Sequence, residues 1–376
     1  MSGAEADGWR IRVARPSLPP LERYVEMLEG VWERGTLTND GPAARELEKE
    51  FAAYGRLDRV LAASSGDVAL TLALAALELP RGTEAVLPSF GYPSTVNAIE
   101  WNGLTPRFVD VDPDDWCLHA EQLDVELDNV SVIVATHMFG APCDVAGLQA
   151  LAGERGIALL YDAAQAVATW VGDHHVARFG DASVISLSAT KVLTSAEGAL
   201  VALPDADAAD RFAQLRSYGM DRDGISRHRG LNAKLSELHA GLGLLSLAGL
   251  DEQLVRRRAL IATYRSALEH RAEVRFQRTP AGATPTPGFA VADLGEHRDI
   301  VRAALAAEGI ESRLYFPALH WMPRLAAVPH APLPVTERLD RGLLALPLYA
   351  ELEPSAVEGI CAVVCRALEE PHTVDG

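Results

Sequence analysis

IALLYDAAQ, residues 157–165, carries the clearest signal for the fold. Its first half is apolar at successive positions, as is VSVIVAT at residues 130–136. Strands that are covered on both faces have this pattern, and they occur in parallel sheets with helices on either side. We therefore predict an α/β fold built around a mostly parallel central sheet.

The rest of the chain extends this pattern in both directions. Apolar runs alternate with helical patterns from about Val60 to Val201, and residues 21–54 predict two helices separated by GTLTNDGP. After Val201 the pattern is mainly helical, with a Leu- and Ala-rich stretch over residues 235–264 and an apolar helix over 355–368. We predict three parts: an N-terminal segment (1–20), a large domain (21–249) and a smaller C-terminal α/β domain (250–376).

Composition and charge narrow the class of protein. The chain has 376 residues, of which 48% are hydrophobic, so it is long enough to enclose a site. Its net charge of -18 is spread through the sequence, which disfavours binding to nucleic acid or to an anionic membrane. The N-terminus shows no basic segment before an apolar run, and no apolar run reaches membrane-spanning length. We expect a cytoplasmic protein.

The cysteines give no indication of a metal site or of disulfides. Cys117, Cys143, Cys361 and Cys365 form no CxxC pair and have no histidine at metal-binding spacing. Cys361 and Cys365 are four residues apart in an apolar helical stretch, so we expect them on one helix face. We predict four reduced thiols and no bound metal.

Asp162 is the first candidate for a functional residue. Ligands of open α/β sheets bind at the carboxyl ends of strands, and Asp162 directly follows the apolar run IALLY. A carboxylate buried there needs a cation or several hydrogen-bond donors. The protonated pyridine nitrogen of pyridoxal phosphate (PLP) would be such a partner, whereas the alternative is a helix N-cap.

Lys191 is the second candidate. It lies in SLSATKVLTSAEGA, a run of small and hydroxylated residues without an acidic side chain before Glu197. A lysine that forms a Schiff base needs a partly desolvated setting with room for a planar cofactor, whereas a lysine that serves solubility usually lies among other charges. Ser186, five residues earlier, and Asp162 in the preceding strand unit favour the first interpretation.

Two further motifs fit a phosphorylated, planar ligand. SSGD, residues 64–67, opens a helix after a strand, and helix N-termini bind phosphate through free N–H groups and the helix dipole. Tyr92, in PSFGYPST, follows another predicted strand and could stack on a flat ring, although an aromatic residue there could also belong to the core.

Together these residues resemble the DegT/DnrJ/EryC1/StrS family of sugar aminotransferases, which are fold-type-I PLP enzymes that aminate keto-sugars. The resemblance runs from about residue 20 to about residue 365. Its motifs are SSGDVAL, PSFGYPSTVNAIEWNG, THMFGAPCDV, DAAQA, SLSATK, GLNAKLSELHAGLG and YFPALH. The order and spacing of the DAAQ and TK blocks are its most specific part.

The resemblance implies roles around the cofactor ring. Lys191 would form the internal aldimine with PLP and shuttle protons, and Asp162 would be the partner of the pyridine nitrogen. Gln165 would contact the ring oxygen, and Tyr92 would stack on the ring face.

The resemblance also implies how the cofactor phosphate is bound. Ser186 would bind it together with the backbone of Gly66 and Asp67. In the family, the motif that corresponds to GLNAKLSE reaches into the neighbouring subunit's site, so Asn232, assisted by Lys234, would contact the partner's cofactor phosphate. The implied assembly is a homodimer with shared active sites.

The family commonly takes its amino group from glutamate and transfers it to a keto-sugar attached to a nucleoside diphosphate, and the composition suggests antibiotic-sugar biosynthesis. Close relatives act on keto-cyclitols instead, and the sequence leaves the acceptor, the position of amination and its stereochemistry open. Asn39, and His320 in YFPALH, are candidate substrate contacts, with a structural role as the alternative for His320.

Two positions near the expected phosphate site depart from the family pattern. Asp67 stands where Thr is usual, and a carboxylate beside a phosphate is repelled unless it caps the helix and turns away. Lys234 stands where Arg is more common, which keeps the charge but loses the bidentate fork. A cofactor-free regulatory or binding homologue is therefore an alternative. A PLP-dependent dehydratase is disfavoured by Lys191, and a nicotinamide oxidoreductase by the absence of GxGxxG after the first strand.

Overall fold

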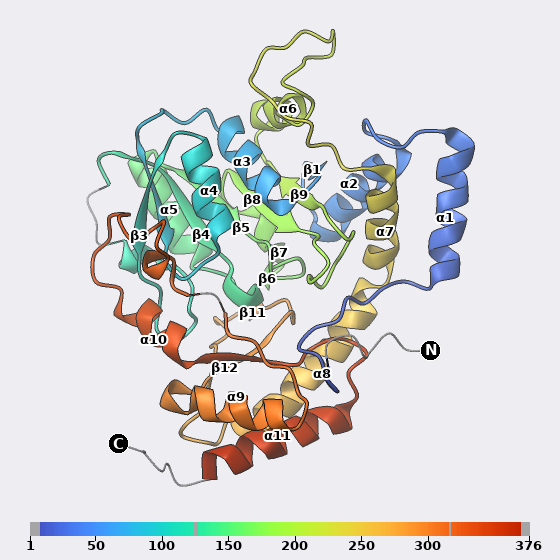
Figure 1. Cartoon of the computed structure of the whole chain (residues 1–376). Coiled ribbons are helices and arrows are strands. Elements are labelled where there is room, and N and C mark those ends of the chain that lie inside the picture. Colours follow the sequence, from blue (N-terminus) through green and yellow to red (C-terminus); the bar gives the residue numbers. More distant parts are fainter. Residues whose placement is uncertain (1–7, 124–126, 316, 370–376) are drawn as a thin grey trace.

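A computed structural model of the chain describes residues 8–123, 127–315 and 317–369. Residues 1–7, at the start of the predicted N-terminal segment, and residues 370–376, at the end of the predicted C-terminal domain, lie outside the described residues. Figure 1 shows a central sheet with helices on both sides, and a second, smaller layer of helices and strands below it. The two layers are linked by α8.

The central sheet has seven strands within the described residues. Their spatial order is β1 (Val60–Ala63), β9 (Ala199–Ala202), β8 (Ala182–Ser186), β5 (Ala158–Asp162), β4 (Val130–Thr136), β2 (Glu84–Pro88) and β3 (Thr105–Val109). β3, β2, β4, β5 and β8 pair in parallel, and only β9 runs antiparallel to its neighbours β8 and β1. The predicted, mostly parallel sheet is confirmed.

The sheet is covered on both faces, as its apolar sequence requires. Leu160 of β5 belongs to one hydrophobic cluster, whereas its neighbours Leu159 and Tyr161 belong to another. The surrounding helices are α1 (Leu21–Arg34), α2 (Pro42–Gly55), α3 (Gly66–Ala76), α4 (Pro93–Trp101), α5 (Val145–Arg155), α6 (Ala206–Leu215) and α7 (Glu237–Ala248). The predicted helical pair within residues 21–54 is therefore present as α1 and α2.

The second layer is built mainly from the C-terminal third of the chain. It comprises α8 (Leu250–Leu268), α9 (Arg298–Ala307), α10 (Pro334–Gly342), α11 (Pro354–Glu369) and the sheet β10 (Arg275–Phe276), β12 (Ala290–Asp293) and β13 (Leu343–Leu346). Residues 8–20 also reach this layer, because Ile11 bridges to Ile310 and the amide of Leu348 donates to the carbonyl of Val13. The predicted domain boundaries stay a prediction.

Smaller elements complete the fold. A three-stranded sheet consists of β11 (Ala283–Thr284), β6 (Trp170–Val171) and β7 (His174–His175). The short 3-10 helices are η1 (Ala120–Gln122), η2 (Met138–Gly140), η3 (Val176–Arg178), η4 (Gly295–His297) and η5 (Leu319–Trp321). The Leu- and Ala-rich stretch over residues 235–264 is two helices rather than one, since it breaks at Gly249 between α7 and α8.

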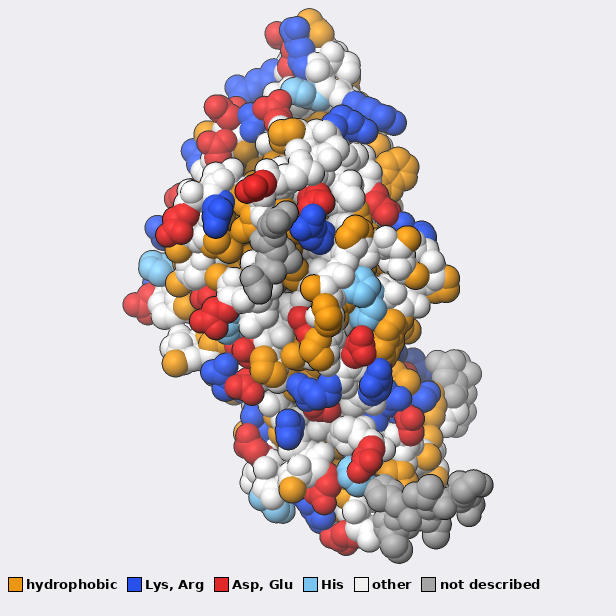
Figure 2. Space-filling model, turned by 90° about the vertical axis from the view of Figure 1, so that its left-hand side faces the viewer, with side chains coloured by type: hydrophobic (Ala, Val, Ile, Leu, Met, Phe, Trp, Pro, Cys, Tyr) orange, Lys and Arg blue, Asp and Glu red, His pale blue; other side chains and the backbone are white. Residues whose placement is uncertain are grey.

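The surface mixes charges of both signs. On the face drawn in Figure 2, acidic and basic side chains are interspersed, and neither sign forms a continuous area. None of the helices in the described ranges combines the length and the apolar character needed to span a bilayer.

Arg216 ties three separate segments together beside the central sheet. Its side chain is 5% exposed, and Nη1 donates to Glu48 Oε1 at 2.7 Å and to the carbonyl of Ala62 at 2.6 Å. Nη2 lies 3.1 Å from Asp40 Oδ1, in the loop between α1 and α2. Its removal would leave the carboxylate of Glu48, which is 14% exposed, without its cation.

We predict that Arg216→Met lowers the free energy of unfolding by about 3 kcal/mol, because a buried ion pair loses one partner. Chemical denaturation at fixed protein concentration measures this change. Arg256→Gln is the control, since Arg256 and Glu252 are 56% and 72% exposed and such a pair contributes about 0.5 kcal/mol. Equal stability of the two variants would contradict the prediction.

Candidate active site

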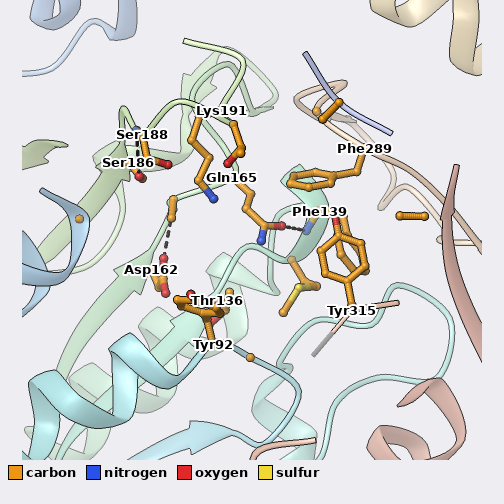
Figure 3. Close-up of a pocket in the computed structure, with 18 of the residues that line it drawn as sticks. Tyr92, Thr136, Phe139, Asp162, Gln165, Ser186, Ser188, Lys191, Phe289 and Tyr315 are labelled. Carbon is orange, nitrogen blue, oxygen red and sulfur yellow. Dashed lines mark hydrogen bonds between the residues drawn. The ribbon is translucent and has the colours of Figure 1, made fainter. Parts of the chain in front are cut away.

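A cavity of about 520 Å³ lies between the carboxyl ends of the parallel strands and the second layer. Thr136 of β4, Asp162 of β5 and Ser186 of β8 line it from the central sheet, and Tyr315 and Leu346 line it from the other side. Figure 3 shows polar side chains of the sheet facing this space, with an aromatic group opposite. The cavity thus lies where open α/β sheets bind ligands.

Most of the sequence-predicted site residues come together here. The residues that line the cavity are Gly66, Asp67, Tyr92, Asp162, Gln165, Ser186 and Lys191. The residues that do not line it are Asn39, Asn232 and His320. The functional roles assigned to all ten stay predictions.

Asp162 is held rigidly at the end of β5. It is 4% exposed, Thr95 Oγ1 donates to its Oδ2 at 2.9 Å, and the amide of Ala164 donates to Oδ1 at 3.1 Å. The alternative role as a helix cap is wrong, because turns rather than a helix follow Asp162. Thr95, on the first turn of α4, was not singled out from the sequence although it lies in the PSFGYPST motif.

Lys191 lies in the connection between β8 and β9 and points into the same space (Figure 3). Its amide donates to the carbonyl of Ser188 in a turn, which carries the side chain over the ends of the strands. Burial lowers the pKa of Lys191, and the charge of Asp162 opposes that shift. Lys191 therefore has more of the neutral, nucleophilic amine at a given pH than an ordinary lysine.

The start of α3 faces Ser186 across a narrow space. Ser65 caps the helix by accepting from the amide of Val68 at 3.3 Å. A Cβ built on Gly66 would lie 3.4 Å from Ser186 Oγ, so glycine keeps the space between the helix end and this hydroxyl open. Free N–H groups at a helix start and a hydroxyl opposite them are suited to an anion.

The alternative that Asp67 caps α3 is wrong, because another residue takes that position. The cap is Ser65, and Asp67 is an exposed residue among those that line the cavity. Burial raises the pKa of Asp67, the charge of Asp162 raises it further, and a hydrogen bond with Ser94 opposes the shift. Negative charge therefore lies near the proposed anion site.

An aromatic wall that the sequence analysis missed closes the cavity. The ring centroids of Phe139 and Tyr315 are 4.6 Å apart, and Phe289 lies 5.6 Å from each of them. The amide of Phe139 donates to Gln165 Oε1 at 2.6 Å, which fixes the Gln165 side chain beside the wall (Figure 3). These rings lie up to 176 positions apart in sequence, so spacing gave no signal.

The remaining candidates have other surroundings. His320 is 7% exposed and its Nδ1 lies 2.7 Å from Ser89 Oγ, so it supports the segment that precedes Tyr92. Asn39 lies in the loop between α1 and α2. Asn232 pairs with Ser217 at the base of the segment that follows α6. Within one chain, the structural interpretation of His320 is favoured.

Asp112, Asp115 and His119 could offer ligand atoms within 4.8 Å of one another. His119 Nε2 already lies 2.9 Å from Asp115 Oδ2, and Arg278 Nη2 lies 3.6 Å and 3.7 Å from the two carboxylates. The chain's own cations therefore balance this acidic cluster.

Comparison with known proteins identifies the family. A sequence profile of the DegT/DnrJ/EryC1/StrS aminotransferase family matches residues 21–365. The chain belongs to this family. It is an aminotransferase, and the resemblance drawn from its motifs is confirmed.

Relatives and solved structures match this aminotransferase over almost its whole length. It is 30% identical to a GDP-perosamine synthase from Caulobacter vibrioides, covering 96% of this chain and 98% of the relative. It is 28% identical to a dTDP-4-amino-4,6-dideoxy-D-glucose transaminase from Escherichia coli, covering 92% of this chain and 96% of the relative.

Solved structures match the fold over a similar length. The crystal structure of DesI with its TDP-sugar product superposes with a TM-score of 0.90 at 33% identity, covering 96% of this chain and 94% of DesI. The aminotransferase TlmJ from Streptoalloteichus hindustanus superposes with a TM-score of 0.89 at 28% identity, covering 95% and 98%. The fold-type-I assignment is thereby confirmed.

The three lysines of the sequence provide an internal test of the site. In the cofactor-free protein, Lys191 should titrate at lower pH than Lys49. Burial lowers the pKa of Lys191, whereas the hydrogen bond between Lys49 and Glu46 raises the pKa of Lys49. Competitive acetylation at a series of pH values, read by peptide mass spectrometry, gives both titration midpoints. A midpoint for Lys191 at or above that of Lys49 would contradict the described site.

Proposed function

We propose that this aminotransferase holds PLP in the cavity and moves an amino group from glutamate to a keto-sugar linked to a nucleoside diphosphate. The observation that carries the proposal is the pairing of Lys191 and Asp162 in one cavity. A lysine with a lowered pKa there faces a buried carboxylate that already has two hydrogen-bond donors.

The residues of the cavity fit the parts of PLP. Asp162, oriented by Thr95, would accept a hydrogen bond from the protonated ring nitrogen. Ser186 and the start of α3 would hold the phosphate in the space that glycine at position 66 leaves open. Lys191 would bind the cofactor covalently through its amine.

The chain's own residues would divide the chemistry among them. When bound, PLP supplies an electron sink for the charge that develops at the substrate carbon. Asp162 would keep the ring nitrogen protonated, and Lys191 Nζ would take a proton from the substrate carbon and return it. Tyr92 would cover one face of the ring, and the amide of Gln165, fixed through Phe139, would contact its oxygen.

The relatives support a sugar acceptor. Their names describe GDP- and dTDP-linked amino sugars, and the DesI structure contains a TDP-sugar product. The cavity is also large enough for a cofactor together with a further ligand. A keto-cyclitol is the alternative acceptor, because the lining does not by itself distinguish the two ring types.

Exposed apolar side chains support a homodimer. Tyr218, Ile225 and Leu231 are each about half exposed on the segment that projects beyond α6 at the top of Figure 1. Lys234 Nζ lies 4.5 Å above the ring centroid of Tyr218 at the base of this segment. If a second copy of the chain covers these side chains, Asn232 of the first copy would approach the cavity of the second copy.

A cofactor-free homologue is the second candidate function, because Asp67 lies on the cavity wall near the proposed phosphate site. In that case the protein would stay folded and dimeric but would bind no PLP. The next experiment separates the two candidates.

Purified protein with PLP should show a visible absorption band from the lysine-bound cofactor, and glutamate should bleach it as the amino group leaves the donor. Lys191→Ala should not form this band. A band that glutamate leaves unchanged would retain PLP and reject glutamate as donor. A colourless, folded protein in excess PLP would support the cofactor-free homologue.

Mixed dimers test whether the site is shared between subunits. We expect Lys191→Ala and Asn232→Ala to be inactive alone, whereas random mixing should restore about a quarter of wild-type activity, because half the dimers then contain one intact site. Activity is measured after co-expression with two different affinity tags. Activity no higher than the parental variants would contradict the shared site.

A further inference from the structure

Two arginines in the described part of the chain are nearly fully buried, and their surroundings differ. Arg216 and Arg257 are each 4% exposed. Arg216 has Glu48 and Asp40 as ion-pair partners. Arg257, in the described structure, has no carboxylate within ion-pair distance and makes one side-chain hydrogen bond, from Nη1 to the carbonyl of Leu348 at 3.3 Å. A buried guanidinium without an anion is costly, so the absence of a partner in the chain needs a reason.

Arg257 faces the active-site cavity. It projects from α8 into the lining, next to Val13 and Leu348, whose backbones are joined by a hydrogen bond. Burial lowers the pKa of Arg257 to about 10, and the charge of Glu351 opposes that shift. Glu351 itself accepts a hydrogen bond from Ser17 and is exposed. The guanidinium therefore stays charged at neutral pH and presents that charge to the cavity.

We propose that Arg257 binds a carboxylate of the amino donor. This inference rests on the proposed aminotransferase function and assigns the residue that selects an acidic donor. A carboxylate carries a single charge in a planar group that matches the free edge of a guanidinium. The apolar neighbours Val13, Leu346 and Leu348 exclude water, which strengthens such a contact.

The other anion that the reaction would bring is the diphosphate of the acceptor. A diphosphate carries more charge and is strongly hydrated, so it needs several donors, and a single buried guanidinium among aliphatic side chains does not provide them. Arg15 and Arg313 line the same cavity but are much more exposed, and Arg313 Nη2 lies 3.2 Å from Glu311 Oε1. These two residues suit the cavity rim, where a hydrated anion can remain in contact with water.

The test titrates glutarate, a dicarboxylate without an amino group, into the full-length protein loaded with PLP, using calorimetry. Arg257→Gln should raise the Kd for glutarate at least about tenfold, because a charged hydrogen bond is lost. Arg258→Gln is the matched control: it removes the same charge from the next, exposed position of α8 and should leave the Kd unchanged. Circular dichroism confirms that each variant is folded.

Parallel titrations with GDP and dTDP separate the two sources of anion. Weaker glutarate binding with unchanged nucleotide binding supports the proposal, whereas unchanged glutarate binding, or a loss confined to the nucleotides, overturns it. If Arg257→Gln does not fold, Arg257→Lys is the deciding variant. It keeps the charge but loses the bidentate geometry of the guanidinium, so it should raise the Kd for glutarate about threefold or more, and an unchanged Kd overturns the proposal.

The visible band of the cofactor is recorded in every sample. Wild-type protein without that band counts against the proposed function, and a normal band with unaltered glutarate affinity counts against this inference alone.

Discussion

The carboxylate of Asp162 lies at the end of a strand whose two faces are both covered by hydrophobic clusters. A charge in that position is unfavourable unless its oxygens are satisfied, and the fold provides Thr95 from α4 and the amide of Ala164. Because β5 pairs in parallel with β4 and β8, the ends of three strands open onto the same cavity. Lys191 then needs only the turn after β8 to reach the same space. The sheet topology thus fixes the position of the cavity and of the two side chains to which we assign the chemistry.

Side chains of both charges line the cavity. Lys191 and Asp162 face one another from the sheet side, and Arg257 brings a second cation from α8 without an ion-pair partner among the described residues. Asp67 adds a carboxylate whose pKa burial raises, in the position where the family usually has Thr. Affinity for a phosphate should therefore depend on the helix dipole, Ser186 and a contribution from a second copy more than on Asp67.

The sequence alone predicted those elements whose residues carry local signals. The successive apolar residues of IALLYD predicted a buried parallel strand, and the positions of Asp162 and Lys191 after such runs placed both at one sheet edge. The residues it missed carry no such signal. Phe139, Phe289 and Tyr315 meet only through the packing of the second layer, and Arg257 resembles its neighbours in RRR until burial distinguishes it. The alternative that Asp67 caps α3 failed because either Ser65 or Asp67 could have taken that position, and Ser65 is the cap.

We propose that Lys191 holds the cofactor opposite Asp162, and covalent trapping is the sharpest test of that assignment. Protein loaded with PLP is reduced with borohydride, digested and mapped by mass spectrometry. We expect a phosphopyridoxyl group on the peptide that contains Lys191, and no modification of Lys49 or Lys234. Modification of either of those lysines instead, or of none of the three, would contradict it.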